Sequence, residues 1–254
     1  MSFRPRPRAP IAHRAGAALV LGAMLIAMLA IPSGAAAATY RDCSTLTPAA
    51  GADMHRCDLA GAVLIGQDLH GINLAKAKLV GINAGCDPDL PRTNLFGAWL
   101  YRANLTNALL CDAILDGADL HRANLTNASL EDATLPDANL ARADLDGVSA
   151  GFALFRDASL ARVTWRNGSS VGGFFNGADL HNADLRGTSF AAARFVGANL
   201  RYARLNNVDL SRADLTGSTL GHATGLSSVT WSDTTCPDGT NSDANGGTCV
   251  GHLS

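Results

Sequence analysis

Aromatic residues and net charge are both low in this chain of 254 residues. Phenylalanine, tryptophan and tyrosine make up 6% of it, and the formal net charge is −2. Proteins that bind single-stranded nucleic acid combine a strongly charged groove with aromatic side chains on which the bases stack. The sequence offers neither in quantity, so nucleic acid is not the expected partner.

Motifs of catalysis and metal binding are also scarce. The seven histidines include no H-E-x-x-H pair, and no glycine-rich phosphate loop is present. G-x-S-x-G occurs at residues 147–151 and 168–172, but without the predicted helix that a nucleophile elbow requires.

Residues 241–246 resemble half of a calcium loop, with Asp238 as a further carboxylate, yet the leading Asp and the closing Glu are missing. We therefore expect no enzyme, no cofactor and no metal, and a hydrogen-bonded turn at 241–246.

Leucine, in contrast, is abundant and recurs with a period of five. Residues 118–145 carry it at six successive positions, Leu120, Leu125, Leu130, Leu135, Leu140 and Leu145. Five residues advance an α-helix by about 500°, which spreads these leucines around its whole surface. In a β-strand an odd spacing puts successive leucines on opposite faces. Neither regular element explains the period.

An alanine stands two residues before each of these leucines, and this pairing explains the period. Residues two apart in a short extended segment share one side. If the chain bends after every pair, all the pairs face one axis and the chain winds into a coil with stacked sides. The residues around each bend are mostly Asp, Asn, Ser, Thr or Gly, which are typical of turns. The pattern predicts an all-β solenoid.

The repeat extends over about two-thirds of the chain. Counting every fifth residue from Leu90 to Leu220 gives 27 centres, of which 20 are leucine and four are phenylalanine. Met54 to Leu79 continue the period upstream but one residue out of register, so we interpret "NAGCDPDL" as a bulge or small corner loop with one extra residue. The expected solenoid, residues 54–224, contains 34 pentapeptides, or about eight coils.

The tandem A(D/N)LXX units resemble those of the pentapeptide repeat proteins. The resemblance implies a right-handed quadrilateral β-helix with four pentapeptides, hence about 20 residues, in each coil. Some members of that family resemble DNA in charge and bind type II topoisomerases, which protects against antibiotics. That function is the alternative for this chain. It requires a dense negative surface, whereas residues 54–220 carry 15 basic and 17 acidic side chains.

The first 38 residues have the layout of a secretory signal peptide. Four arginines are followed by an apolar stretch and by small residues that predict cleavage near Ala37 or Ala38. The alternative is an uncleaved anchor, because the uncharged stretch is long enough to span a membrane. We expect a secreted, periplasmic or cell-envelope protein, in contact with a membrane only if the leader is retained.

Six cysteines in an exported chain favour disulfides. The spacing favours three pairs: Cys236 with Cys249, Cys43 with Cys57, and Cys86 with Cys111. The first of these is the strongest expectation, because it brackets a polar, glycine-rich loop. Cys57 stands at an inward position and is open to a second interpretation as a small buried residue.

Both ends of a solenoid expose open sheet edges, which need protection against aggregation. Residues 39–53 and 225–254 lie outside the repeat and are expected to form an N-terminal and a C-terminal cap. In the second of these, Val229 and Trp231 are expected to cover the last coil.

Folding the sequence at 20 residues per coil aligns four arginines in one outward column, Arg102, Arg122, Arg142 and Arg162. Neighbouring arginines about 5 Å apart in water repel each other by roughly 1 kcal/mol. Asp119, Asp144 and Asp184 are expected to offset that repulsion. The column is either a solvated face of mixed charge or a stripe that binds an acidic polymer.

A second outward column is apolar. With two flanking residues, it consists of Ile114, Phe152, Leu154, Val171 and Phe174. The interior thins at the same level, where Ala150 and Ser170 replace leucine. We favour an inward turn of Phe152 or Phe174 into that space, because protein interiors contain few voids. The alternative is an exposed patch that binds a partner protein or a second copy of the chain.

Taken together, these features predict an exported, non-enzymatic rod with disulfide-closed ends. It is expected to act as a structural or binding module in the cell envelope or outside the cell. The sequence does not name its ligand, which is either a protein or an acidic polymer.

Overall fold

The computed structural model describes residues 40, 41, 43 and 45–253. The predicted signal peptide, residues 1–38, lies outside this part of the chain, together with its cleavage site. Within the described residues, no helix combines the length and the apolar character that crossing a membrane demands.

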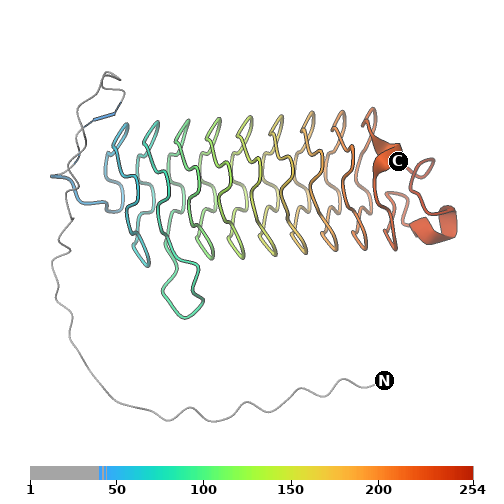
Figure 1. Ribbon diagram of the computed structural model, residues 1–254, viewed down its shortest axis with the longest axis horizontal. Coiled ribbons are helices and arrows are strands. Elements are labelled where there is room, and N and C mark those ends of the chain that lie inside the picture. The colour runs from blue at the N-terminus through green and yellow to red at the C-terminus, as the bar shows by residue number, and fades with distance from the viewer. Residues whose placement is uncertain (1–39, 42, 44, 254) are drawn as a thin grey trace, which may run out of the picture. The chain divides into compact units, whose positions relative to one another are not determined.

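The chain winds as a coil whose successive turns lie side by side (Figure 1). Parallel backbone bridges join residues 20 apart, as in the series Asn104, Asn124, Asp144, Thr164, Asp184 and Arg204. One turn contributes four such bridges, for example at Asn94, Trp99, Asn104 and Leu109, so the coil has four faces. Each bridge involves only one residue from each of the two coils that it joins. The faces are therefore ladders of isolated parallel bridges rather than sheets of long strands.

Each corner is a tight turn that a backbone hydrogen bond within the repeat closes. The amide of Ala103 donates to the carbonyl of Leu100 at 2.9 Å, and the amide of Leu100 donates to the carbonyl of Asp119 in the next coil at 2.7 Å. The second residue of each corner has a positive φ, which is 55° at Arg102 and 64° at Gly117. Glycine adopts this conformation freely, and Asn and Asp visit it more readily than other residues. This requirement explains the polar and glycine residues that follow each leucine.

One coil is longer than the others. The bridges Asp68–Asn94 and Asn83–Leu109 join residues 26 apart instead of 20, so this turn contains six extra residues. Together with the two residues of an ordinary corner, they form a loop, residues 85–92, that projects from the coil in Figure 1. The alternative of a corner loop is therefore confirmed, whereas the expected single extra residue is wrong. Leu90, counted as an inward centre, is 43% exposed and belongs to the loop.

Leucine and alanine fill most of the interior. Aromatic side chains fill the coils around Ala150 and Ser170, the two centres at which leucine is missing. Trp165 is fully buried there, with its ring centre 5.4 Å from that of Phe190. The favoured inward turn of Phe152 or Phe174 is wrong, because Phe152 is 59% exposed and Phe174 remains half-buried in its outward column. Trp165 on the neighbouring face supplies the missing volume instead.

The ladder continues past residue 224. Two further bridges, Asp209–Thr230 and Asp214–Thr235, join residues 21 apart. The 3₁₀ turn η1, Leu226–Ser228, lies in this longer segment, and a second 3₁₀ turn, η2, Ser242–Asn245, lies in the terminal loop. Val229 and Trp231 are buried at this end.

Three disulfides join the six cysteines: Cys43–Cys57, Cys86–Cys111 and Cys236–Cys249. These are the three pairs that the sequence spacing favoured. Cys57 is thus a disulfide partner and not a lone buried residue. The first bridge closes the entry to the coil, the second ties the projecting loop to the coil, and the third closes the terminal loop that contains η2.

Candidate binding surfaces

The four arginines of the predicted column lie at one corner of the coil. Arg102, Arg122, Arg142 and Arg162 occupy the second corner position in successive turns, with φ values of 55°, 59°, 60° and 60°. All four are exposed. The amide of Arg102 donates to the carbonyl of His121, the residue before the next arginine, at 3.0 Å. Neighbouring chains in such a ladder are about 4.8 Å apart, so the arginine side chains leave the backbone at that spacing.

The four arginines of the column have no direct carboxylate partner among the described residues. The three aspartates expected to offset the repulsion do not form ion pairs with the column, and their oxygens have other partners. Asp119 accepts from the side chain of Asn139, and Asp144 accepts from Thr164. Asp184 pairs with two arginines outside the column.

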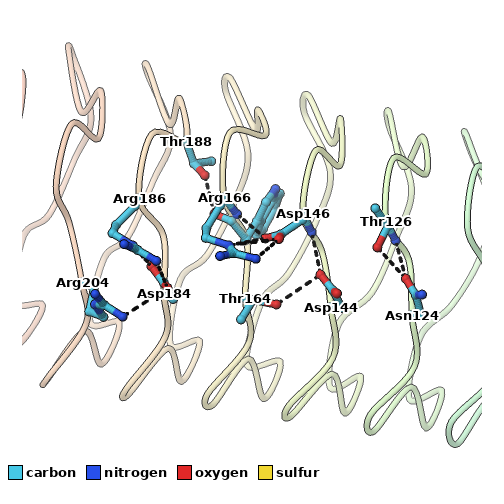
Figure 2. Close-up of polar contacts among 11 residues, drawn as sticks. Asn124, Thr126, Asp144, Asp146, Thr164, Arg166, Asp184, Arg186, Thr188 and Arg204 are labelled. Carbon is cyan, nitrogen blue, oxygen red and sulfur yellow. Dashed lines mark hydrogen bonds and ion pairs between the residues drawn. The ribbon is translucent and has the colours of Figure 1, made fainter.

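Three arginines outside the column, Arg166, Arg186 and Arg204, form ion pairs with aspartates on the adjoining face and corner; we call them the paired group. Figure 2 shows Arg166 against Asp146, and both Arg186 and Arg204 next to Asp184. Arg186 binds both oxygens of Asp184, at 2.7 and 2.8 Å. Arg166 likewise binds both oxygens of Asp146, one coil away. Together with Asn167, Asn206 and Asn207, the three arginines line a shallow polar recess.

Both carboxylates of this group are held in the ionised form. Partial burial by itself would raise the pKa of Asp146, but hydrogen bonds from Arg166 outweigh it and lower the pKa. Burial acts on Asp184 in the same direction and is outweighed by the hydrogen bonds and charges of Arg186 and Arg204, so its pKa is also lowered. These arginines therefore connect parts of the coil, in contrast to the unpaired column.

The predicted apolar residues do lie together. Ile114, Thr134, Leu154 and Phe174 bridge in sequence along one face, and Phe152 and Val171 stand at the adjoining corner, 59% and 38% exposed. Arg156 covers part of this column, with its guanidinium carbon 5.8 Å from the ring centre of Phe174. The patch is therefore outward and partly accessible.

The projecting loop converts one end of this patch into a groove. Pro88, Leu90 and Arg92 from the loop face Phe152, Leu154 and Thr134 across a shallow groove that is also lined by Asp112 and Asp132. Arg92 fixes the loop, because its side chain donates to the backbone carbonyl of Asp112 at 2.5 Å and to that of Asp132 at 3.2 Å. The Cys86–Cys111 bridge holds the other end.

The loop residues of this groove were not predicted from the sequence. The break in the period at "NAGCDPDL" was a signal that something leaves the coil there. The break did not indicate how many residues leave it, or that Leu90 points to solvent.

The serines of the two G-x-S-x-G matches serve the coil. Ser170 is buried, and its hydroxyl donates to the carbonyl of Ala150 at 2.8 Å. Ser149 donates to Glu131. Neither is accompanied by a histidine, so the geometry is not that of a catalytic triad.

The oxygen atoms of the calcium-like segment are engaged in hydrogen bonds of the loop itself. The side chain of Asn241 accepts from the amide of Asp243 at 2.9 Å and caps η2. Asp238 accepts from the hydroxyl of Thr240 at 2.6 Å and contacts Nδ1 of His252 at 2.7 Å. The segment is a hydrogen-bonded, disulfide-closed turn.

Four-faced turns, one tight bend every five residues and columns of outward side chains define a β-solenoid repeat protein. Pentapeptide repeats, in eight copies, match residues 50–84, 89–127, 123–162 and 193–224. These segments cover more than half of the chain. The chain therefore belongs to the pentapeptide repeat family, whose fold is a right-handed β-helix.

Several solved structures of this family are similar to the chain. HetL, involved in heterocyst differentiation regulation in the cyanobacterium Nostoc sp. strain PCC 7120, is 29% identical over 76% of this chain and 86% of HetL, with a TM-score of 0.45. A trypsin-treated variant of QnrB1, a plasmid-mediated fluoroquinolone resistance protein, is 18% identical over 69% of this chain and 88% of that one, with a TM-score of 0.41. Rfr23 from the cyanobacterium Cyanothece 51142 is 23% identical over 45% of this chain and 85% of that one, with a TM-score of 0.24. No curated protein matches the chain.

Proposed function

We propose that this protein is an exported, non-enzymatic binding rod of about eight coils that acts in the cell envelope or outside the cell. The observation that carries the proposal is that all six cysteines are joined in three disulfides. Such bridges form and persist in oxidising compartments and are rare in the cytoplasm of mesophiles. The signal-peptide layout of residues 1–38 supports the same location.

The filled interior supports binding rather than catalysis. Leucine, alanine and the aromatic group around Trp165 occupy the core, so a ligand can be held only on the outside. Two outward surfaces are suited to that role. The groove beside Phe152 presents apolar side chains to a protein, and the unpaired arginine column presents positive charge to an acidic polymer.

Topoisomerase binding by DNA mimicry is less well supported. A mimic of DNA needs a dense row of negative charges and must act in the cytoplasm. The unpaired column described above is positive, and three disulfides favour the opposite compartment.

Cell fractionation tests the proposal. Producing cells are separated into cytoplasmic, envelope and extracellular fractions, and the intact mass of the protein is measured after alkylation of free thiols. We expect a chain that begins near Thr39, carries no alkyl group and is recovered outside the cytoplasm. A cytoplasmic chain that retains Met1 and has six alkylated cysteines would overturn the proposal.

A further inference from the structure

The basic column is longer in the structure than the sequence indicates. A coil with the single extra residue expected from the sequence places Gly81 next to Arg102. The 26-residue coil instead places Lys76 there: the amide of Lys76 donates to the carbonyl of Tyr101 at 2.8 Å. The amide of Arg56 donates to the carbonyl of Ala75 at 2.9 Å and continues the column by one more turn. The projecting loop thus brings two further cations into line.

The result is a basic ladder of six residues in six successive coils, Arg56, Lys76, Arg102, Arg122, Arg142 and Arg162. All six occupy the second corner position with positive φ, and all six are exposed. At about 4.8 Å per coil, the backbone positions of the six residues span about 24 Å. The next two residues of the same column are Asn182 and Tyr202, so the ladder of cations ends at Arg162.

Carboxylates on the adjoining faces contact other partners among the described residues. Asp53 contacts Nδ1 of His55, and Asp58 pairs with Lys78 at 3.0 Å. Asp119 and Asp144 have the partners described above. In the part of the chain that the structure describes, no ladder cation takes part in an ion pair. The six charges repel each other, and a bound anion would relieve that repulsion.

We propose that the basic ladder binds a linear polysaccharide that carries one acidic group on each sugar. The evenly spaced cations match a polymer whose charges recur at a similar interval, because one sugar ring has roughly the length of one coil step. Duplex DNA presents phosphates every 3.4 Å along each strand and matches the ladder less well. This proposal names a ligand class for the proposed function and rests on that function, because such a polysaccharide is met outside the cytoplasm.

Aromatic side chains beside the ladder are suited to sugar rings. Trp99 is 61% exposed on the face that leads into the corner of Arg102. Tyr101 and His121 stack with ring centres 5.8 Å apart and nearly parallel planes. The apolar faces of sugar rings pack on such surfaces, while the acidic groups reach the cations. One corner therefore offers both kinds of contact.

Binding to polygalacturonate, measured at increasing NaCl concentration, tests the inference on the disulfide-bonded protein. Affinity should fall steeply with salt, because the bound cations displace the polymer's counterions. Replacing Arg56 and Lys76 together by Gln removes two of the six contacts and should lower the salt slope of log K by about a third. Thermal melting of the variant should match the wild type, since both side chains are exposed.

A matched pair of triple variants separates the ladder from general charge. Arg122, Arg142 and Arg162 replaced by Gln should weaken binding at least tenfold. Arg166, Arg186 and Arg204 replaced by Gln remove the same charge from the paired group and should leave binding nearly unchanged. Neutral dextran should not bind.

Three results would overturn the inference. Equal weakening by the two triple variants would mean that only diffuse charge matters. Tighter binding of single-stranded poly(dT) than of polygalacturonate would assign the ladder to nucleic acid. No binding of polygalacturonate by an exported, fully disulfide-bonded protein would refute the ligand class alone, whereas a cytoplasmic location would refute the proposed function.

Discussion

Trp165 and Gly168 pack so closely that no side chain fits at position 168. A Cβ added to Gly168 would lie 2.6 Å from Cδ1 of Trp165 and 2.6 Å from the carbonyl oxygen of Val148. The indole also donates to that carbonyl, at 3.3 Å. The large Trp165 thus compensates for Ala150 and Ser170, and the space left for residue 168 is only that of a hydrogen atom.

Replacing Gly168 by Ala is therefore expected to destabilise the coil. Overpacking of a filled core costs about 1–3 kcal/mol. Gly221→Ala is the control, because an added Cβ there meets only the end of the flexible Arg201 side chain, at 3.8 Å. Thermal or urea unfolding of the two variants measures the difference. Equal midpoints would mean that Trp165 does not lie over Gly168.

The inward and outward positions of the repeat are expected to differ sharply in tolerance. Leu125 is fully buried, whereas Thr126 follows it at a corner and bonds Asn124 (Figure 2). Leu125→Asn leaves an unpaired amide and a partly empty site between coils, at a cost of several kcal/mol. Thr126→Asn should change stability by less than about 1 kcal/mol. If circular dichroism shows the same melting temperature for both, the inward assignment of the leucine is wrong.

The three disulfides are expected to react with reductant in a definite order. Cys86 is exposed, whereas the other five cysteines are buried. Thiol–disulfide exchange requires access of the attacking thiolate to a sulfur atom. Under limiting dithiothreitol, alkylation and peptide mapping should detect Cys86 and Cys111 first. Early labelling of Cys236 or Cys249 would show that the terminal loop opens more easily than its packing indicates.

The terminal loop is expected to depend on pH only in strongly acidic solution. Hydrogen bonds from the hydroxyl and amide of Thr240, followed by that from His252, lower the pKa of Asp238 to about 2. Because the folded pKa lies below the unfolded value of about 3.9, the carboxylate contributes stability above pH 4 and loses it as the pH falls through 2. The contribution is small, since the group is exposed.

An NMR titration of the Asp238 carboxyl carbon measures this directly. The midpoint should lie near 2. It should rise further in Thr240→Val than in His252→Ala, because Thr240 is the larger cause. A wild-type midpoint near 4 would contradict the hydrogen-bonded geometry of the loop.

Much of the fold follows from one constraint that the sequence repeats in every coil. Each fifth residue must fill the interior and each corner must tolerate a positive φ, so Leu125 and Asn127 were assignable without coordinates. Chain separation favoured the three disulfide pairs but left the pairing open beyond Cys236 with Cys249. The column of four arginines followed from folding the sequence at 20 residues per coil.

The loop at residues 85–92 was not predictable in the same way. Its length is fixed by long-range contacts, namely the Cys86–Cys111 bridge and the reach of Arg92 to backbone carbonyls in two later coils. No periodic pattern encodes them. The core around Ser170 was also mispredicted, because a tryptophan on the neighbouring face, and not an outward phenylalanine, supplies the missing volume.

The basic ladder depends on the alignment that this loop creates, with Lys76 beside Arg102. A paired cysteine variant, Lys76→Cys with Arg102→Cys, tests it by peptide mapping after air oxidation. Neighbouring positions in the ladder are about 4.8 Å apart, which is within disulfide range. We expect a new bridge between positions 76 and 102 beside the three native ones. A bridge that forms instead in the pair Gly81→Cys with Arg102→Cys, and none at 76, would show a coil with the single extra residue expected from the sequence and would contradict the six-residue basic ladder.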